Sequence, residues 1–516
     1  MIPASKDHTS QTVAVPVWAG FAMMCLGMFM AILDVQVVAT SLPTIQDALK
    51  IPQDQMSWIQ TAYLIAEIVS IPLTGFLTRL LTMRWMFVCA VILFTISSIA
   101  CAMSENFPAL ITFRAMQGFS GGALIPAVFS AVFLLFPIER QPLATMIGGA
   151  LAVLAPTVGP IVGGWITETY SWPWLFLINV GPGAVAACVA AVTLPKDRVA
   201  LNEIRRLDFV SLVLGAVALA ALEIAIKEAP TRGWSSALVL VLFGLCLLAV
   251  VRFIFRTLHA RRPLVDLRTF SDKNFSIGCL LSFVLGIGLF GSVYLMPVFL
   301  AYVRDHNALE IGVIMLVTGV AQLIMAPVAV FLVSRVDERI LTAFGFLMFA
   351  LGLALSAFQT NTTDFSGMFW PQVVRGCAIM FCILPPTQLA LGHLKKSAIG
   401  DASGLFNLMR NLGGAIGIAL IDTVIYTRVP DYAHRLADRL IGGDLETARL
   451  LDISPDVLAA AAIDAEKQAA IAGLVKKAAF VDAINDAWAL VALVTMAVLI
   501  VVPLVRAPIK PTAIRT

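Results

Sequence analysis

Seven ionisable residues of this sequence lie inside long apolar runs, where lipid or protein surrounds a side chain in place of water. They are Asp34, Glu67, Arg114, Glu223, Arg375, Arg410 and Asp422. A charge at the centre of a membrane-spanning helix costs about 2.5–3.5 kcal/mol even on the most lenient scale, so such residues are rare and often functional. The chemistry open to them is proton binding and release, charge pairing, and contact with a charged solute.

Asp34 and Arg114 are the strongest candidates for proton chemistry. A buried carboxylate beside a cation can exchange a proton for contacts with its partner or a solute, as a cavity opens and closes. A static salt bridge that holds two helices together is the alternative. Glu67 lies deep within its apolar run, where the lack of water favours the protonated form, and is the second candidate proton carrier.

The other four charges are candidates for a cavity between helices. Glu223 precedes Lys227 by one helical turn, and a surface pair of this spacing is an equally good explanation that needs no role in transport. Arg410 and Asp422 fall on one predicted helix and are candidates for facing an aqueous cleft, as is Arg375 on the helix before it.

The composition identifies the bilayer as the solvent of this chain. Of its 516 residues, 59% are hydrophobic and only 13% are charged, whereas soluble domains are about half apolar and one quarter charged. A soluble protein is therefore excluded. The net charge of +3 is small and predicts no nucleic-acid partner.

The sequence lacks the motifs of the common enzyme classes. We find no G-x-S-x-G, no H-E-x-x-H and no P-loop, and the five histidines are scattered. The eight cysteines show no metal-binding spacing. We therefore expect no enzyme activity, no metal and no cofactor, and no ATP-binding site in this chain.

Runs long enough to cross about 30 Å of hydrocarbon as a helix predict fourteen spans in an all-α polytopic membrane protein. The spans are expected near residues 15–40, 56–77, 85–103, 108–136, 142–167, 173–195, 208–226, 236–257, 275–302, 309–333, 339–358, 367–392, 402–426 and 486–506. An even number places both termini on one side, and most Lys and Arg residues fall on the loops of that side, which predicts that it is cytoplasmic.

Two short patterns recur in the same order, which indicates that the chain is built from two similar halves. In the first pattern, Phe76-Leu77 precedes Arg79 and Arg84, and its counterpart is Phe331-Leu332 before Arg335 and Arg339. In the second, Phe107-Pro108 precedes Arg114, and its counterpart is Trp370-Pro371 before Arg375. In such proteins the halves rock about a solute site near the midplane.

The repeat divides the chain into five predicted regions. They are a cytoplasmic tail (1–14), a six-helix half (15–195), two inserted helices with flanking loops (196–274), a second six-helix half (275–506), and a cytoplasmic tail (507–516). The long loop 427–485 lies on the outer face, where Gly442-Gly443 and Pro455 are expected to break it into short amphipathic helices. It is either a solvated cap or a docking surface for another protein.

Several motifs follow one family. They are Leu33-Asp34 before Leu42-Pro43, Arg114 with Gln117-Gly118 on the fourth helix, Gly159-Pro160 with Gly163-Gly164 on the fifth, Trp172 and Trp174 before Asn179, and a cytoplasmic loop with Gly75 and Arg84. In that loop Arg79 stands at the usual aspartate and Thr82 at the usual second glycine. The sequence resembles the major facilitator superfamily, and within it the fourteen-span drug:proton antiporters of the EmrB/QacA type.

The resemblance implies an inner-membrane exporter of amphipathic or lipophilic organic compounds, driven by the proton gradient. It implies proton coupling at Asp34 and Arg114, and an antiporter motif at Gly159, Pro160, Gly163 and Gly164. In a cell with two membranes it also implies a periplasmic adaptor protein and an outer-membrane channel, with 427–485 as a candidate contact. The alternatives are a dedicated exporter of one endogenous metabolite, such as a siderophore or lipid-derived product, and a membrane sensor or scaffold that transports nothing.

Overall fold

The computed structural model describes residues 15–51, 56, 58–196, 208–260, 263, 265–451, 453 and 465–506. Within this part of the chain the secondary structure is helical throughout, and thirteen helical runs are long and apolar enough to cross a membrane. An all-helical, multi-pass membrane protein is therefore confirmed.

The thirteen runs are consistent with fourteen crossings, because one run of 45 residues, Trp58–Ala102, contains two predicted spans. It is made of α3 (Trp58–Ser70), the 3-10 turn η1 (Ile71–Leu73) and α4 (Thr74–Ala102). Within α4 the backbone leaves the helical conformation at Thr82, whose φ is 71°. Glycine reaches positive φ without a steric cost, which fits the glycine expected at this position from the resemblance.

The remaining helices follow in chain order. Before the inserted pair they are α1 (Val15–Thr40), α2 (Leu42–Leu49), α5 (Phe107–Leu135), α6 (Gln141–Thr169), α7 (Trp174–Leu177) and α8 (Val180–Thr193). The inserted pair is α9 (Phe209–Arg232) and α10 (Ala237–His259), followed by the 3-10 turn η3 (Leu267–Ser271). After it come α11 (Lys273–Arg304), α12 (Ala308–Val333), α13 (Glu338–Leu355), α14 (Phe365–Leu391), α15 (Lys396–Ile441), α16 (Leu445–Leu450), α18 (Ala465–Ala497), η4 (Val498–Ile500) and η5 (Val502–Leu504).

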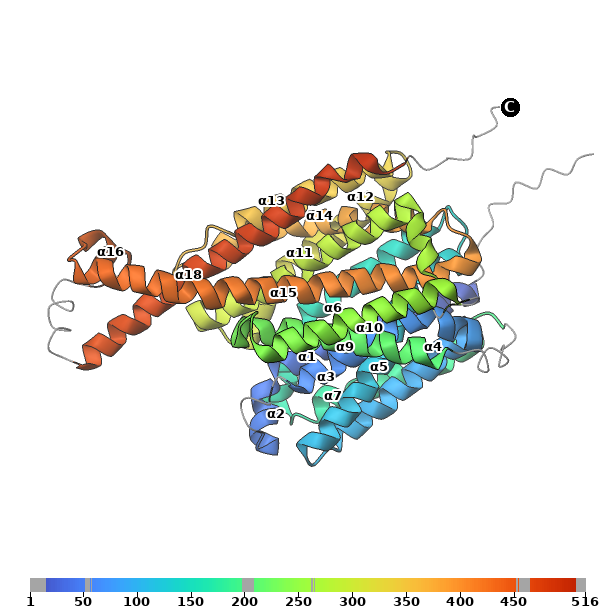
Figure 1. The fold of residues 1–516 in the computed structure, drawn as a ribbon, viewed down its shortest axis with the longest axis horizontal. Helices are drawn as coiled ribbons and strands as arrows, with labels where there is room; N and C mark the ends of the chain where they lie inside the picture. The colour runs from blue at the N-terminus through green and yellow to red at the C-terminus, as the bar shows by residue number, and fades with distance from the viewer. Residues whose placement is uncertain are drawn as a thin grey trace, which may run out of the picture.

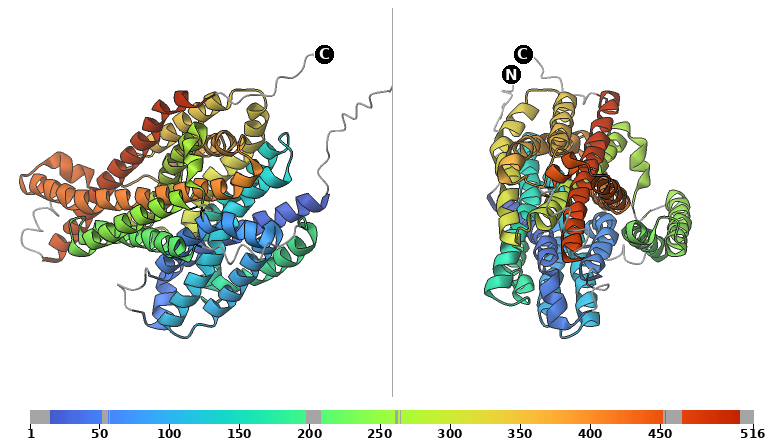
Figure 2. Two further views of the ribbon diagram at one scale, coloured as in Figure 1. Left: turned by 45° about the vertical axis from the view of Figure 1, so that its right-hand side comes forward. Right: turned by 90° about the vertical axis from the view of Figure 1, so that its left-hand side faces the viewer.

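The helices form two bundles side by side, each around its own apolar core (Figure 1). The first core is built mainly from α1, α4, α5 and α8, and the second mainly from α11 to α14 and α18. The inserted helices α9 and α10 pack on each other at the flank of this pair, where α9 contacts both α3 and α15 (Figure 2). We call the end of the bundle where α1 begins and η5 ends the terminal face.

The prediction of separate short helices in 427–485 is confirmed in part: α16 (Leu445–Leu450) is short and follows the break at Gly442-Gly443, but the segments on either side belong to long helices. Helix α15 continues without a break to Ile441, and α18 already begins at Ala465, so both project beyond the bundle away from the terminal face (Figure 1). Leu440, Leu451 and Val475 belong to a small apolar core between the two projections, and this packing favours continued helices. As expected, α15 ends before Gly442-Gly443; Pro455 lies outside the described residues.

Candidate functional site

Asp34 and Arg114 meet in the interior of the first bundle. Arg114 Nη1 donates a hydrogen bond of 2.5 Å to Asp34 Oδ2, and neither side chain is exposed. Asp34 comes from α1 and Arg114 from α5, which are 80 residues apart along the chain. The predicted pairing is therefore present, and it is fully enclosed in this conformation.

Two amides complete the surroundings of the Asp34 carboxylate. Gln117 Nε2 donates to Asp34 Oδ1 at 2.9 Å, and Asn179 Nδ2 donates to the same oxygen at 2.7 Å. Gln117 Nε2 also donates to Ser98 Oγ at 2.8 Å, while Gln117 Oε1 accepts from Arg114 Nη1 at 2.7 Å. Both carboxylate oxygens thus act as acceptors, in a network that joins helices α1, α4 and α5 to the start of α8.

Arg114 is held from its other side by α3. Its Nε donates to the carbonyl oxygen of Ile59 at 3.1 Å, and its guanidinium lies 4.4 Å from the centre of the Tyr63 ring. Tyr63 Oη donates in turn to the carbonyl oxygen of Ala31 on α1 at 3.1 Å. Nη2 of Arg114 is buried without a hydrogen-bond partner among the described atoms. These contacts fix the guanidinium plane and aim it at Asp34.

Glycines of two motifs allow the helices to approach closely enough for this network. A Cβ on Gly118 would overlap the carbonyl oxygen of Tyr63, so α5 can pack against α3 only with glycine at this position. A Cβ on Gly159 would overlap the side chain of Gln36, two residues beyond Asp34 on α1. Pro160, Gly163 and Gly164 are at most partly exposed on the same helix α6.

Glu67 on α3 and Glu223 on α9 lie near the contact between α3 and the inserted helix. Glu67 is 8% exposed, and the charge of Glu223 acts on it. Glu223 Oε2 is buried without a hydrogen-bond partner among the described atoms. Lys227 acts electrostatically on Glu223, as its spacing predicted, but its ammonium also donates to Thr61 on α3. The inserted helix therefore adds a carboxyl group beside one of the predicted proton carriers.

The structure separates Arg410 from Asp422, although both belong to α15. Asp422 Oδ1 accepts a hydrogen bond of 2.7 Å from Tyr294 Oη on α11, within the second bundle. Arg410 lies 5.3 Å from the ring of Phe129 on α5, in the other bundle. Arg375 on α14 is buried in the second bundle, where Nη2 donates to Thr318 Oγ1 at 3.3 Å.

The loop motif brings the two bundles together at the terminal face. Arg79 forms an ion pair with Asp401 at the start of α15, and a Cβ on Gly75 would overlap the same carboxylate. Ser403 Oγ donates to the carbonyl oxygen of Pro126 at 3.0 Å, across the same boundary. Arg84, by contrast, lies over the ring of Trp85 on its own helix. The bundles are thus closed against each other at this end.

Sequence reasoning did not predict Asp401 as a site residue, because it lies at the edge of a predicted span. Its partner Arg79 is 322 residues away along the chain, and nothing local to Asp401 indicates the contact. Asn179 belonged to a recognised motif but had no assigned role. Ser98 and Tyr63 are common residues of apolar helices, and the sequence carries no signal that singles them out.

Breaking the Arg79–Asp401 pair is expected to open the terminal face. The reporter is Ser403→Cys, the single thiol of an otherwise cysteine-free chain, at a position that is buried in this conformation. Arg79→Ala should raise its rate of labelling by a hydrophilic maleimide severalfold, because the Arg79–Asp401 pair holds this end closed. The exchange Arg79→Asp with Asp401→Arg should restore slow labelling. If labelling is equally slow in Arg79→Ala and the parent, the pair does not hold this end closed.

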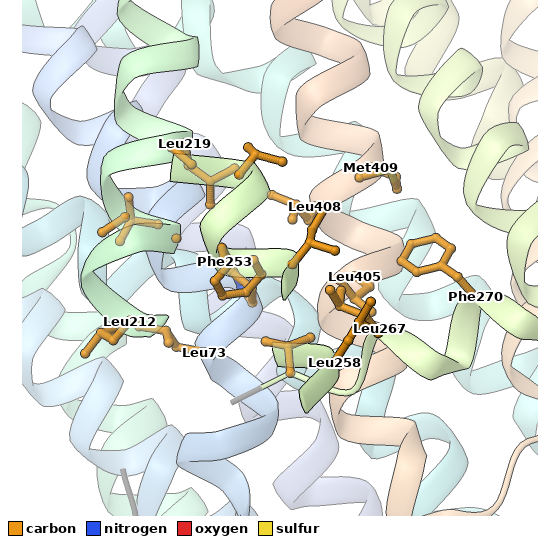
Figure 3. A pocket seen from close by; sticks show the side chains of 18 residues that line it. Leu73, Leu212, Leu219, Phe253, Leu258, Leu267, Phe270, Leu405, Leu408 and Met409 are labelled. Carbon is orange, nitrogen blue, oxygen red and sulfur yellow. The ribbon is translucent and has the colours of Figure 1, made fainter. Parts of the chain in front are cut away.

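An apolar cavity of about 470 Å³ lies between the inserted helices and the rest of the protein, beside the contacts of α9 with α3 and α15 (Figure 3). It lies towards the terminal face, between η1, α9, α10, η3 and α15. Leu73, Leu212, Phe253, Phe270 and Leu408 are among the apolar side chains that point into it. None of its 18 lining residues is charged, so its chemistry suits a hydrocarbon or aromatic group.

The fold and the site together define a class of protein. Two helical bundles meet at one closed end, and a buried carboxylate–guanidinium network lies inside one of them, as in secondary transporters that alternate between two open states. The model of the Major Facilitator Superfamily matches residues 24–418. The chain belongs to this superfamily.

Characterised relatives cover most of the chain. It is 39% identical over 407 residues to the colistin resistance protein EmrB of Acinetobacter baumannii, which is 79% of this chain and 80% of the relative. It is 32% identical over 403 residues to the multidrug export protein EmrB of Escherichia coli K12, or 78% of each chain. These relatives agree with the branch that the motifs indicated.

Solved structures share the fold. The crystal structure of the human organic anion transporter MFSD10 matches with a TM-score of 0.58 and 14% sequence identity, over 94% of this chain and 100% of that one. At this sequence identity the match supports only the fold. The chain is accordingly a multi-pass membrane transporter of this superfamily and not an enzyme.

Proposed function

We propose that this protein exports amphipathic or lipophilic organic compounds in exchange for protons, by alternating access. The observation that carries the proposal is the enclosed network of Asp34, Arg114, Gln117 and Asn179. Two relatives are named for multidrug export and for colistin resistance, which supports export of organic compounds. The apolar cavity beside the inserted helices supports a cargo with a lipophilic body.

Proton binding at Asp34 supplies a reason for the network to rearrange. A proton on Oδ2 occupies the position that receives the Arg114 hydrogen bond and removes the negative charge that balances the guanidinium. An unbalanced cation in a water-free site is unfavourable, so a conformation that hydrates Arg114 or gives it another partner is then favoured. Loss of the proton restores the ion pair and the closed network. In this way one proton shifts the balance between two conformations.

Glu67 is the second site that we propose for a proton. Two carboxyl groups that interact in a buried place cannot both ionise without a large cost, so Glu67 and Glu223 would hold at least one proton between them. Because Glu223 belongs to α9, this proton would also link the inserted helices to the first bundle.

The orientation follows from the distribution of positive charge. We place the terminal face in the cytoplasm, since the loops on that side carry most Lys and Arg residues, and the membrane is then the inner membrane. The projections of α15 and α18 extend to the outer side, where they form a candidate contact for a periplasmic adaptor protein that leads to an outer-membrane channel. The other partners that we propose are the cargo and the lipid bilayer. The proton gradient supplies the energy for export, and the proposal involves no cofactor.

Dye efflux with and without a protonophore tests the proposal. Cells that express the protein should lose several unrelated lipophilic dyes faster than control cells, and the difference should disappear when the gradient collapses. A dedicated exporter of one metabolite would not move the dyes. A sensor or scaffold would transport nothing, and either result would contradict the proposal.

A further inference from the structure

Arg375 is a buried cation without a carboxylate partner in the part of the chain that the structure describes. It is 3% exposed on α14, and its Nε and Nη1 atoms have no hydrogen-bond partner among the described atoms. The hydrogen bond from Nη2 to Thr318 Oγ1 is long, at 3.3 Å. The guanidinium forms no ion pair with an Asp or Glu side chain of the described residues.

The two halves differ in how a buried arginine is balanced. Arg114 of the first half is neutralised by Asp34 on the first helix of that half. Arg375 follows Pro371 by four residues, whereas Arg114 follows Pro108 by six. The first helix of the second half, α11, contains only Lys273 and Arg304 as charged residues. A buried cation without a partner has lost its hydration, and no ion pair offsets the free-energy cost of that loss. In one state of the transport cycle, therefore, an anion from outside the chain is the natural partner.

The side chain of Gln372, close to Arg375, also has an N–H donor without an acceptor among the described atoms. Gln372 Oε1 accepts from Thr318 Oγ1 at 3.0 Å, and the amide nitrogen of Gln372 has no hydrogen-bond partner among the described atoms. The Arg375 guanidinium lies 5.5 Å from the centre of the Trp488 ring. Buried donors that lack acceptors are expensive to leave unsatisfied. Together these groups offer unused N–H donors and an aromatic face to a ligand.

A small cavity opens on these donors at the boundary between the halves. Its volume is about 20 Å³, and its polar lining consists of Thr157, Ser292, Thr318, Gln372 and Arg375. Thr157 belongs to α6 of the first half, and the other four belong to the second half. Separation of the halves along this boundary would therefore enlarge the cavity and expose the guanidinium.

We infer that Arg375 and Gln372 bind the carboxylate of an amphipathic organic monoanion in the cleft between the halves. Each edge of the Arg375 guanidinium, Nε with Nη2 or Nη1 with Nη2, matches the two oxygens of a carboxylate. Nη2 has a second N–H beyond its long bond to Thr318, and the Gln372 amide supplies a further donor. One guanidinium balances one negative charge, which favours a monoanion over a phosphate dianion. This inference rests on the proposed export function and names the chemical class of one kind of cargo.

Binding of two matched probes tests the inference. The purified full-length protein is titrated with radiolabelled 1-naphthylacetate and 1-naphthylacetamide, which share size and ring system but differ in charge. The native protein should bind the carboxylate about tenfold or more tightly than the amide, as expected for a charged hydrogen-bonded pair. In Arg375→Gln the preference should fall to about one, with the affinity for the amide unchanged.

Arg410→Gln is the matched control, since Arg410 is another buried arginine with unsatisfied nitrogens but lies against Phe129 away from this cavity. It should keep the preference for the carboxylate. Without a probe, Arg375→Gln should unfold at the same temperature as the native protein or higher, because no ion pair is lost. A clearly lower unfolding temperature would show that the charge is satisfied within the protein and would overturn the inference.

Two further results would also overturn it: equal binding of both probes by the native protein, and a preference that survives Arg375→Gln. Neither depends on transport, because the titration uses no gradient. Efflux of uncharged dyes from cells tests the export function separately. The inference is supported if Arg375→Gln no longer distinguishes the two probes but still exports uncharged dyes normally. If the native protein exports no dye, only the proposed function is contradicted.

Discussion

Asp34→Asn is expected to reduce proton-coupled efflux to background. The amide cannot take up and release a proton, so the step that shifts the network between its two arrangements is lost. The structure adds a second effect. The Asp34 oxygens meet three donors, from Arg114, Gln117 and Asn179, and an amide NH₂ placed on either side faces a donor. Stability should therefore fall by about 3–5 kcal/mol, because Arg114 keeps its buried charge without a counterion.

The measurement is dye efflux driven by an imposed pH difference in reconstituted vesicles, together with thermal unfolding of the purified variant. Asp305→Asn provides the control. Asp305 is exposed and adopts a left-handed backbone that asparagine tolerates, so this variant removes an acidic group without touching the network. It should behave as the native protein does. Efflux at the full rate in Asp34→Asn would exclude Asp34 as the proton carrier and shift the proposal to Glu67.

Arg114→Ala should have the larger effect on the fold. It removes hydrogen bonds to Asp34, Gln117 and the Ile59 carbonyl, and it removes the cation that lies over Tyr63. The Asp34 carboxylate then stays buried without a counterion, next to a cavity the size of the lost side chain. We expect a loss of about 3–5 kcal/mol from the stranded charge, with a further cost for the cavity. Folded yield and unfolding temperature should fall, and coupled efflux should be absent.

The double variant Asp34→Asn/Arg114→Gln separates a proton relay from a static salt bridge. It buries no charge at this site, so its unfolding temperature should lie well above that of either single variant. Coupled efflux should nevertheless remain absent, since no titratable group is left in the network. If the double variant recovers both stability and coupled efflux, the pair only holds the helices together.

Much of the architecture follows from properties that are local in sequence. Residues that cross a bilayer must be apolar over a helical length, so the spans and their ends can be located without knowing any tertiary contact. Single residues locate finer features as well: α15 stops before Gly442-Gly443, and Thr82, at the usual second glycine, has a positive φ. Helices in the outer segment 427–485 were predicted, but not that α15 and α18 continue into it as long projections. In water a helix of this composition persists only when packing supports it, here through the apolar cluster that includes Leu440 and Val475.

The sequence also determined which residues are unusual, because a charge in an apolar run is costly wherever the helix packs. It therefore singled out Asp34, Arg114, Glu67 and Arg375. What it could not determine is which of these charges is balanced. That depends on the relative rotation of helices far apart in the chain, which brings Asp34 to Arg114, leaves Arg375 without a carboxylate, and joins Arg79 to Asp401. Pairing is a short-range property of atoms in space, so the tertiary structure alone decides it.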